Sequence, residues 1–303
     1  MAPGLSVLIP VFNWNVNPLV GALLAQGGDW PGPVEIILLD DGSHEEFRVL
    51  NRPLAKQAGV RYQELAQNVG RAAIRNQLAA AAQHQWLLLL DNDSLLPDAQ
   101  LLARYAAART QAPVLIGGTC YSPAQPADAA LYLRWLYGQV REARPAAVRQ
   151  RAPHGQLTIN NALIRADVLA RFPLNEALSG YGHEDTALGL ALSQAKISVV
   201  HLDNPVLHGG LEPAAVFLQK SEEAVRNLAQ MHRHSGGAAE SRLLKTAGRL
   251  RRFGLAPAAR LLLKSLAPTL RRGLLTPRPR LAHLDLLKLY WLLEHEATAC
   301  KLP

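Results

Sequence analysis

The chain has 303 residues, of which 49% are hydrophobic and 18% charged, so a sizeable core is expected and intrinsic disorder is not. That length suits one large α/β domain with an appendage, or two small domains. Cys120 and Cys300 lie far apart and predict neither a disulfide framework nor a metal-ligand pair, which fits a reducing cytosol. With no signal-peptide pattern and no run of about 18 apolar residues, we expect a cytoplasmic chain without a transmembrane helix.

The net charge of +8 is concentrated at the C-terminal end. From His232 onward there are 14 Lys and Arg against 4 Asp and Glu, a balance of +10, whereas residues 1–231 have a balance of −2. Such asymmetry indicates an anionic partner of the C-terminal part: a membrane surface, a nucleic acid or an acidic polymer. Because Ser235-Gly236-Gly237 resembles a linker, we predict a first domain over residues 1–235 and a basic, Leu/Arg-rich helical region over 236–303.

Apolar runs alternate with helix-like segments along the first domain. Strands are predicted at Leu5–Val11, Val34–Leu39, Trp86–Leu90, Val114–Gly117, Leu157–Arg165 and Ile197–Leu207. Helices are predicted at Pro18–Gln26, Glu45–Ala58, Ala72–Gln83, Asp167–Arg171 and Glu184–Ala195, with Ala127–Val148 helical or irregular. This alternation predicts an α/β fold with an open, mostly parallel sheet and flanking helices.

Acidic residues follow these strands, where ligands bind in such sheets. They are Asp40-Asp41, Asp91 with Asp93, Glu184-Asp185 and the more isolated Asp203, and His208 follows the last strand. Mg²⁺ and Mn²⁺ prefer oxygen ligands, and an imidazole can add to them at Mn²⁺. A diphosphate leaving group needs its growing charge neutralised, so the pattern suits metal-assisted chemistry on a nucleotide.

Several segments, in order, resemble the motifs of the family 2 glycosyltransferases with the GT-A fold, over about residues 5–230. They are Leu5–Asn13, Leu39–Ser43 with its Asp-Asp-Gly-Ser turn, Asn68–Asn76, Leu90–Asp93 with its D-x-D pattern, Asn160–Arg165, and Gly180–Gly189 with its Glu-Asp pair. The resemblance implies a mixed, mostly parallel GT-A sheet and a C-terminal helical appendage. It also implies inverting transfer from a nucleotide sugar, by family habit a UDP-sugar, to a hydroxyl of a glycan or a lipid-linked acceptor.

The resemblance also implies a role for each matching residue. Asp185 would be the general base for the acceptor hydroxyl, and Glu184 would hold the acceptor or the base. Asp93 would ligate Mn²⁺ or Mg²⁺, with His208 as a further ligand. The nucleotide-sugar donor would be bound by Pro10, Phe12, Asn13, Asp41, Asn68, Gly70, Arg75, Asp91 and Asn92. Tyr181 and His183 depart from the residues that the family often has beside its acceptor.

Each motif also has a plainer interpretation. Asp40 or Asp41 can cap a turn or the following helix. Asp91-Asn92-Asp93 can be an ordinary loop, and Glu184-Asp185 can be a helix start favoured by the helix dipole. A histidine such as His208 at a strand end is often a satisfied core or surface group.

Other functional classes fit less well. Neither a G-x-G-x-x-G after the first strand nor a G-x-x-x-x-G-K-[ST] occurs, which disfavours a dinucleotide-dependent oxidoreductase and a phosphate-cradling NTPase. A nucleotidyltransferase, a silent sugar-nucleotide binder and a basic membrane- or nucleic-acid-binding protein stay open. The negative balance of residues 1–231 argues against nucleic acid as a partner. A homodimer is compatible with the sequence.

The C-terminal region has a basic amphipathic pattern. Its basic residues at steps of three and four are Arg242, Lys245, Arg249 and Arg252, and they share one helix face. The apolar residues are Leu243, Ala247 and Leu250 on a neighbouring face, then Leu284, Leu287 and Trp291 with Tyr290 beside them. We expect peripheral contact with the anionic cytoplasmic face of a membrane. The alternative is that the apolar stripes pack on the first domain or on a second subunit.

Overall fold

The computed structural model describes residues 2–177, 182–234 and 241–299, and the chain divides into two compact units. The sheet unit comprises Met1–Ser122, Arg141–Ala177 and Glu184–Gly210. The helical unit comprises Pro123–Val140, Leu178–His183 and Leu211–Pro303. The expected linker Ser235-Gly236-Gly237 lies outside the described residues, so the domain boundary there stays a prediction.

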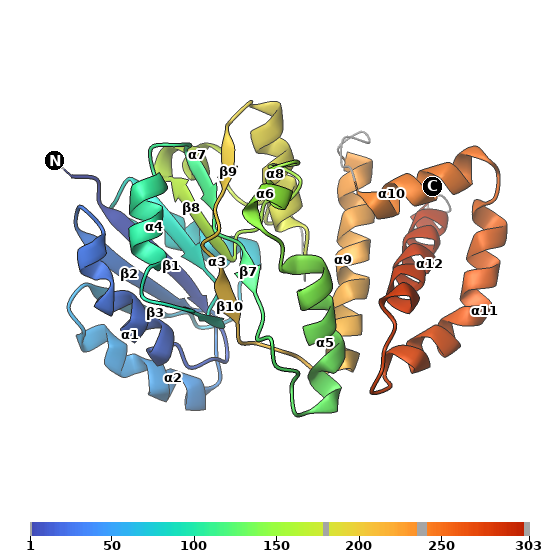
Figure 1. Ribbon diagram of the computed structural model, residues 1–303, viewed down its shortest axis with the longest axis horizontal. Coiled ribbons are helices and arrows are strands. Elements are labelled where there is room, and N and C mark those ends of the chain that lie inside the picture. Colours follow the sequence, from blue (N-terminus) through green and yellow to red (C-terminus); the bar gives the residue numbers. More distant parts are fainter. Residues whose placement is uncertain (1, 178–181, 235–240, 300–303) are drawn as a thin grey trace. The chain divides into compact units, whose positions relative to one another are not determined.

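The sheet unit is built on one central sheet (Figure 1). Its strands are β1 Leu5–Val11, β2 Val34–Asp40, β3 Val60–Glu64, β4 Trp86–Leu90, β6 Val114–Ile116, β8 Asn161–Arg165 and β9 Val199–His201. They lie in the order β3-β2-β1-β4-β8-β6-β9. β8 is antiparallel to β4 and β6, and the other neighbouring pairs are parallel. The expected mixed, mostly parallel sheet is therefore confirmed.

Helices cover both faces of this sheet because successive strand residues point to opposite sides. The helices of the unit are α1 Asn17–Ala25, α2 Glu45–Asn51, α3 Arg71–Ala81, α4 Leu101–Ala108, α6 Ala146–Arg149, α7 Ala166–Arg171 and α8 Glu184–Gln194. One core packs α1 and α4 against strand residues such as Val7 and Ile9. The other packs α3, α7 and α8 against residues such as Leu8 and Leu89.

A second, three-stranded sheet lies at the carboxyl ends of the main strands. It contains β5 Ser94–Leu95, β7 Thr119–Cys120 and β10 Val206–His208, in the order β5-β10-β7. The single strand expected at Ile197–Leu207 is thus wrong, because β9 ends at His201 and β10 begins at Val206. Asp203-Asn204-Pro205 separates them, and these residue types favour turns. The break lets β10 leave the main sheet.

The helical unit contains the following elements: η3 Ala129–Leu131, α5 Tyr132–Tyr137, α9 Ala214–His234, α10 Arg242–Arg252, α11 Ala256–Leu274 and α12 Leu281–Ala299. α12 packs against α9, α10 and α11. Leu284, Leu287 and Trp291 are all buried, so this apolar stripe serves packing within the unit. On α12, the Lys288 ammonium donates to the Tyr137 hydroxyl at 3.2 Å and lies 4.5 Å from the centre of that ring. No helix of the described part of the chain is long and apolar enough to cross a membrane.

A buried polar network fixes the carboxyl end of β6 beneath the second sheet. The Asn161 side chain, fully buried on β8, donates to the Gly118 carbonyl at 2.9 Å and to the Asn204 carbonyl at 2.8 Å. It also accepts a 2.7 Å bond from the Tyr105 hydroxyl. Buried polar groups are costly when unpaired, so this one amide stabilises three segments of the chain at once.

We expect Asn161→Ala to lower the free energy of unfolding by about 3 kcal/mol, because three buried hydrogen bonds would be lost together with the packing of a fully buried side chain. The matched control is Asn175→Ala, an exposed amide that bonds only the Ala177 N–H among the described contacts and should cost less than about 1 kcal/mol. Urea unfolding of both variants measures the difference. Equal losses would contradict a structural role for this network.

Candidate active site

The loop after β1 lies where the strand order of the main sheet reverses. β1 pairs with β2 as far as Val11, but its pairing with β4 ends at Leu8 opposite Leu89. Pro10 lies beyond that last pair and has no N–H to offer β4. The two central strands therefore stop pairing toward their carboxyl ends, at the kind of switch point where open α/β sheets bind ligands.

The loops after β1 and β2 are tied together by Asn13. Its backbone is left-handed, with φ +47°, which asparagine tolerates better than most residues. Its N–H donates to Ser43 Oγ at 2.9 Å, and its Oδ1 accepts from the His44 N–H at 2.8 Å. The Asn92 amide, from the loop after β4, donates to the Phe12 carbonyl at 3.2 Å. Three of the predicted donor-binding residues thus meet at neighbouring strand ends.

The two aspartates after β2 have different partners. Asp40 is fully buried and accepts from the Ser43 N–H at 2.7 Å, so the turn-capping interpretation holds for it. Asp41 accepts from the Val69 N–H at 2.7 Å, which holds the segment from Asn68 to Gly70 beside the turn. Burial raises the pKa of Asp41, and the Val69 and Gly70 amides oppose that rise.

Asp91 lies among basic side chains from the start of α3. Arg75, only 4% exposed, forms a short ion pair with Asp91, and Arg71, 42% exposed, approaches Asp91 at 3.7 Å. Burial favours the neutral acid, but Arg75 and Arg71 outweigh it and keep the pKa of Asp91 below its usual range. Arg71 also reaches Glu184 at 3.4 Å, so it links the loop after β4 to the first turn of α8.

In the acidic pair at the start of α8, Glu184 and Asp185, one carboxyl group has a shifted pKa. Glu184 is buried, and its Oε1 makes no hydrogen bond although it faces Arg71. Burial, together with the negative charge of Glu184, raises the pKa of Asp185 to about 7, while Arg75 and Arg71 pull it down. A carboxyl group that titrates near neutral pH is suited to accept and release protons, which exceeds what a simple helix start requires.

Asp93 and His208 are brought together by the second sheet. His208 on β10 pairs with Ser94 on β5, next to Asp93 in the chain, and His208 Nδ1 lies 3.2 Å from Asp93 Oδ2. The His208 ring also contacts the ring of Tyr121, with centroids 5.3 Å apart. At Gly210, an added Cβ would lie 2.1 Å from Asp93 Oδ2, so a larger residue there would force the Asp93 carboxylate to move.

Not every predicted residue joins the cluster. Gly180 and Tyr181 lie outside the described residues. His183 belongs to the helical unit, where burial lowers its pKa to about 4. Asp203 accepts from the Ala146 N–H at 2.6 Å and so serves the start of α6. Asn68 is exposed, and its place in the donor site stays a prediction.

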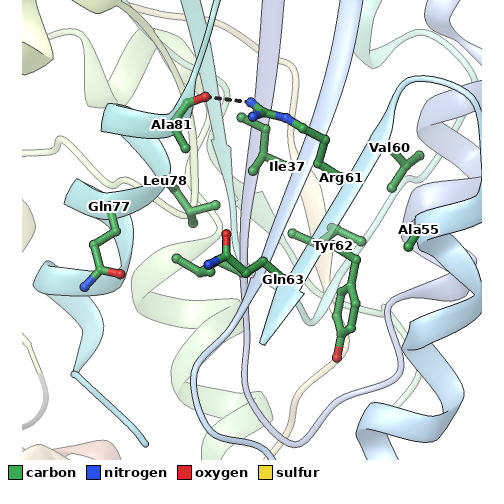
Figure 2. Close-up of a pocket in the computed structure, with 11 residues that line it drawn as sticks. Ile37, Ala55, Val60, Arg61, Tyr62, Gln63, Gln77, Leu78 and Ala81 are labelled. Atoms are coloured by element: carbon green, nitrogen blue, oxygen red, sulfur yellow. Dashed lines mark hydrogen bonds between the residues drawn. The ribbon is translucent and has the colours of Figure 1, made fainter. Parts of the chain in front are cut away.

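Two surface cavities help to delimit the site. A cavity of about 360 Å³ is lined by Asn92 together with apolar groups such as Trp14 and Phe47, so it reaches the predicted cluster. Figure 2 shows another, of about 540 Å³, between β3 and α3, where Arg61 donates to the Ala81 carbonyl at 2.6 Å. None of the predicted site residues lines that second cavity.

Sequence reasoning missed two contributors. Arg71 bridges Asp91 and Glu184, although Asn68, Gly70 and Arg75 were the residues of that segment expected to act. Its position four residues before Arg75 on a helix was a usable signal, since such residues share a face. Gly209 and Gly210 follow His208 directly, and a pair of glycines there signals close approach of the chain to another group.

The two arginines of α3 offer a matched test of this electrostatic arrangement. Arg75→Gln should lower the free energy of unfolding by about 3 kcal/mol, because it leaves a partly buried carboxylate without its main partner. Arg71→Gln, at a largely exposed side chain that reaches the same carboxylate, should cost less than about 1 kcal/mol. Urea unfolding distinguishes them, and a larger loss at Arg71 would contradict the burial-based ranking.

The fold is similar to that of solved glycosyltransferases. The mannosyltransferase PcManGT from Pyrobaculum calidifontis, in complex with GDP-Man and Mn²⁺, has a TM-score of 0.58 at 17% identity, with 98% of this chain and 87% of that chain covered. S. aureus TarS 1–349 has a TM-score of 0.52 at 14% identity, with 99% and 92% covered. Its complex with UDP has a TM-score of 0.50 at 14% identity and the same coverage. No match was found among curated proteins.

The model of the family described as Glycosyl transferase family 2 matches residues 6–160, more than half of the chain. The matched segment includes the loop after β1, Asp41, and the Asp91–Asp93 loop. Glu184, Asp185 and His208 follow it, so their roles rest on their geometry and on the motif resemblance. The chain belongs to glycosyl transferase family 2 and is a nucleotide-sugar-dependent glycosyltransferase.

Proposed function

We propose that the enzyme is an inverting transferase that moves a sugar from a nucleoside diphosphate, with UDP as the favoured nucleotide, to a hydroxyl of a glycan or a lipid-linked acceptor. The observation that supports it best is the raised pKa of Asp185, which lies in one electrostatic cluster with Arg71, Arg75 and Asp91. Asp93 lies two residues after Asp91 in the loop after β4, and His208 on β10 contacts it. A base and a metal-binding pair at one edge of the sheet are what this reaction needs.

The pair Asp93 and His208 fits a divalent cation. In an octahedral shell with ligands at about 2.1 Å, neighbouring ligand atoms lie about 3 Å apart, and the two protein atoms are 3.2 Å apart. Among the described residues, no three His, Cys, Asp or Glu side chains lie close enough together to hold a metal ion. Oxygens of the diphosphate would therefore complete the coordination shell. When bound, the cation supplies the positive charge that stabilises the departing diphosphate.

Residues of the chain itself can accept the proton that the acceptor hydroxyl loses during transfer. Asp185 takes the proton of the acceptor hydroxyl. At the same time the acceptor oxygen forms a bond to the anomeric carbon, and the bond from that carbon to the diphosphate oxygen breaks. Arg75 and Arg71 keep Asp91 ionised, so Asp91 is available to a ribose hydroxyl or to the metal region. Asp41, held beside Val69, would accept a hydrogen bond from the base of the nucleotide.

The nucleotide itself is the finer part of the proposal. PcManGT was solved with GDP-Man, and TarS with UDP, so proteins of similar fold use either base. A turnover screen with UDP- and GDP-sugars tests our preference for UDP. Turnover with GDP-sugars alone would overturn that preference and leave the proposed mechanism intact.

The metal role predicts a graded loss of activity at two positions. Asp93→Asn should lower turnover about 10²-fold or more, because the leaving group loses its neutralising charge. Gly210→Ala should weaken the metal affinity about 10- to 100-fold, since its Cβ would displace the Asp93 carboxylate. Turnover titrated with Mn²⁺ or Mg²⁺ after treatment with EDTA gives both values.

Gly21→Ala is the matched control, because a Cβ at this helical glycine meets nothing within 4 Å. That variant should keep the metal affinity of the wild type and gain a little stability. Full turnover of the wild type in metal-free buffer would contradict the metal role.

The base role predicts a specific pH profile. Asp185 must be ionised to accept a proton, so kcat/KM should rise with pH, bend at a pKa of about 7 and level off above it. Asp185→Asn should lower the rate about 10²- to 10⁴-fold while donor binding is kept. Glu184→Gln removes a like charge, so it should move the bend of the remaining activity to lower pH.

If Asp185→Asn kept both the wild-type rate and the wild-type dependence of kcat/KM on pH, Asp185 would be excluded as the base. An unmoved bend in Glu184→Gln, with Asp185→Asn inactive, would instead show that the charge of Glu184 does not contribute to the raised pKa of Asp185.

A further inference from the structure

The helical unit leaves a second apolar surface that its packing does not use. On α11, Leu263, Leu270 and Leu274 are buried against the unit, but Leu261 and Leu262 on the same helix are 62% and 60% exposed. Leu266 is also exposed and lies one turn after Leu262, on the same side. At the corner between α10 and α11, Phe253 is 71% exposed and Leu255 is exposed beside it. We call Phe253, Leu255, Leu261, Leu262 and Leu266 the α11 surface.

The exposure of so many large apolar side chains on the α11 surface needs an explanation. Single exposed leucines are ordinary, but several large apolar side chains along one helix and the corner before it mark an interaction site. The stripe expected to face outward, Leu284 with Leu287 and Trp291, is buried within the unit. The unit therefore satisfies its own core and still presents the α11 surface to its surroundings.

Basic side chains without acidic partners border this surface. Arg249 and Arg252 are exposed on α10 within about one turn of Phe253, and Lys264 is exposed on α11 three residues after Leu261, on the same side of the helix. No ion pair neutralises these three among the described residues. The nearby glutamates are already taken, since Glu296 pairs with Arg251 at 2.9 Å and Glu294 with Arg260 at 3.2 Å.

We propose that the α11 surface docks on an anionic lipid membrane, with its leucines and Phe253 entering the headgroup boundary and Arg249, Arg252 and Lys264 facing lipid phosphates. Exposed apolar side chains bordered by cations are the arrangement that interfacial helices use, and each basic side chain adds to the binding. A second copy of the chain is a poorer occupant, because a symmetric contact through this surface would bring the same positive charges together. The proposal is independent of the sugar and nucleotide.

The experiment is co-sedimentation of the full chain with phosphatidylcholine vesicles, with or without phosphatidylglycerol, at low and high salt. We expect binding only to the anionic vesicles, weakened by salt. Leu262→Ser/Leu266→Ser should lower the partition about tenfold or more for each leucine lost from the boundary. Arg249→Gln/Arg252→Gln should lower it about fivefold for each charge.

Matched controls come from the sheet unit. Val49→Ser/Leu50→Ser removes two exposed apolar side chains of α2, and Arg151→Gln/Arg171→Gln removes two exposed charges. Both controls should bind as the wild type does, and all variants should keep the unfolding midpoint and the turnover of the wild type on donor in solution. The proposal is overturned if the wild type ignores anionic vesicles at low salt, or if it binds and the α11 variants bind equally well. A concentration-dependent dimer that only the leucine variant loses, without vesicle binding, would also overturn it in favour of self-association.

Discussion

The buried guanidinium of Arg75 beside the Asp91 carboxylate is the interaction on which the site geometry depends. Removing both charges from water is costly, and only their close contact offsets that cost. Because α3 starts next to this pair, Arg71 one turn earlier can also reach Glu184 on α8. The charge on Glu184 in turn adds to the burial that raises the pKa of Asp185. Burial and Glu184 thus raise the pKa of the proposed base, and the two arginines of α3 oppose that rise.

The small sheet of β5, β7 and β10 performs a second positioning task. β10 pairs with β5 in the register that places His208 opposite Ser94, beside Asp93. Gly209 donates from its N–H to the Asp93 carbonyl at 2.8 Å, and Gly210 leaves room for the carboxylate. Backbone pairing therefore brings together two potential metal ligands that are distant in sequence. Asp93 directly precedes β5 and His208 lies on β10, so the pairing of these two short strands holds the two proposed ligands beside each other.

The sequence predicted the central strands well for a physical reason. β1, β2 and β4 are buried on both faces, so each is a mostly apolar run, with Ser6 in β1 and Glu35 in β2 as the polar exceptions within them. The edge strand β3 at Val60–Glu64 was missed because Val60 and Tyr62 are its only apolar residues, too few to form an apolar run like those of the central strands. Asn161 was expected to lie within a longer strand, but its side chain instead serves a buried network that no local pattern reveals.

The site was predictable to the extent that its residues occur in recognisable motifs. The motifs singled out Asp41, Asp91, Asp93 and Asp185. The structure places Asp41 directly after β2, Asp91 and Asp93 in the loop after β4, and Asp185 in the first turn of α8. Contacts between segments were not predictable, because a single sequence does not say which side chains meet after folding. The bridge from Arg71 to Glu184 and the capping role of Asp203 are of this kind.

The configuration of the product tests the central claim most directly. One base at Asp185, acting on an acceptor that attacks opposite the diphosphate, permits a single displacement. The account therefore predicts that NMR of the new glycosidic linkage will show the anomeric configuration inverted relative to the donor sugar. Retained configuration, with a wild-type enzyme and a defined acceptor, would exclude a single displacement from the face opposite the diphosphate and would contradict the assignment of Asp185 as its base.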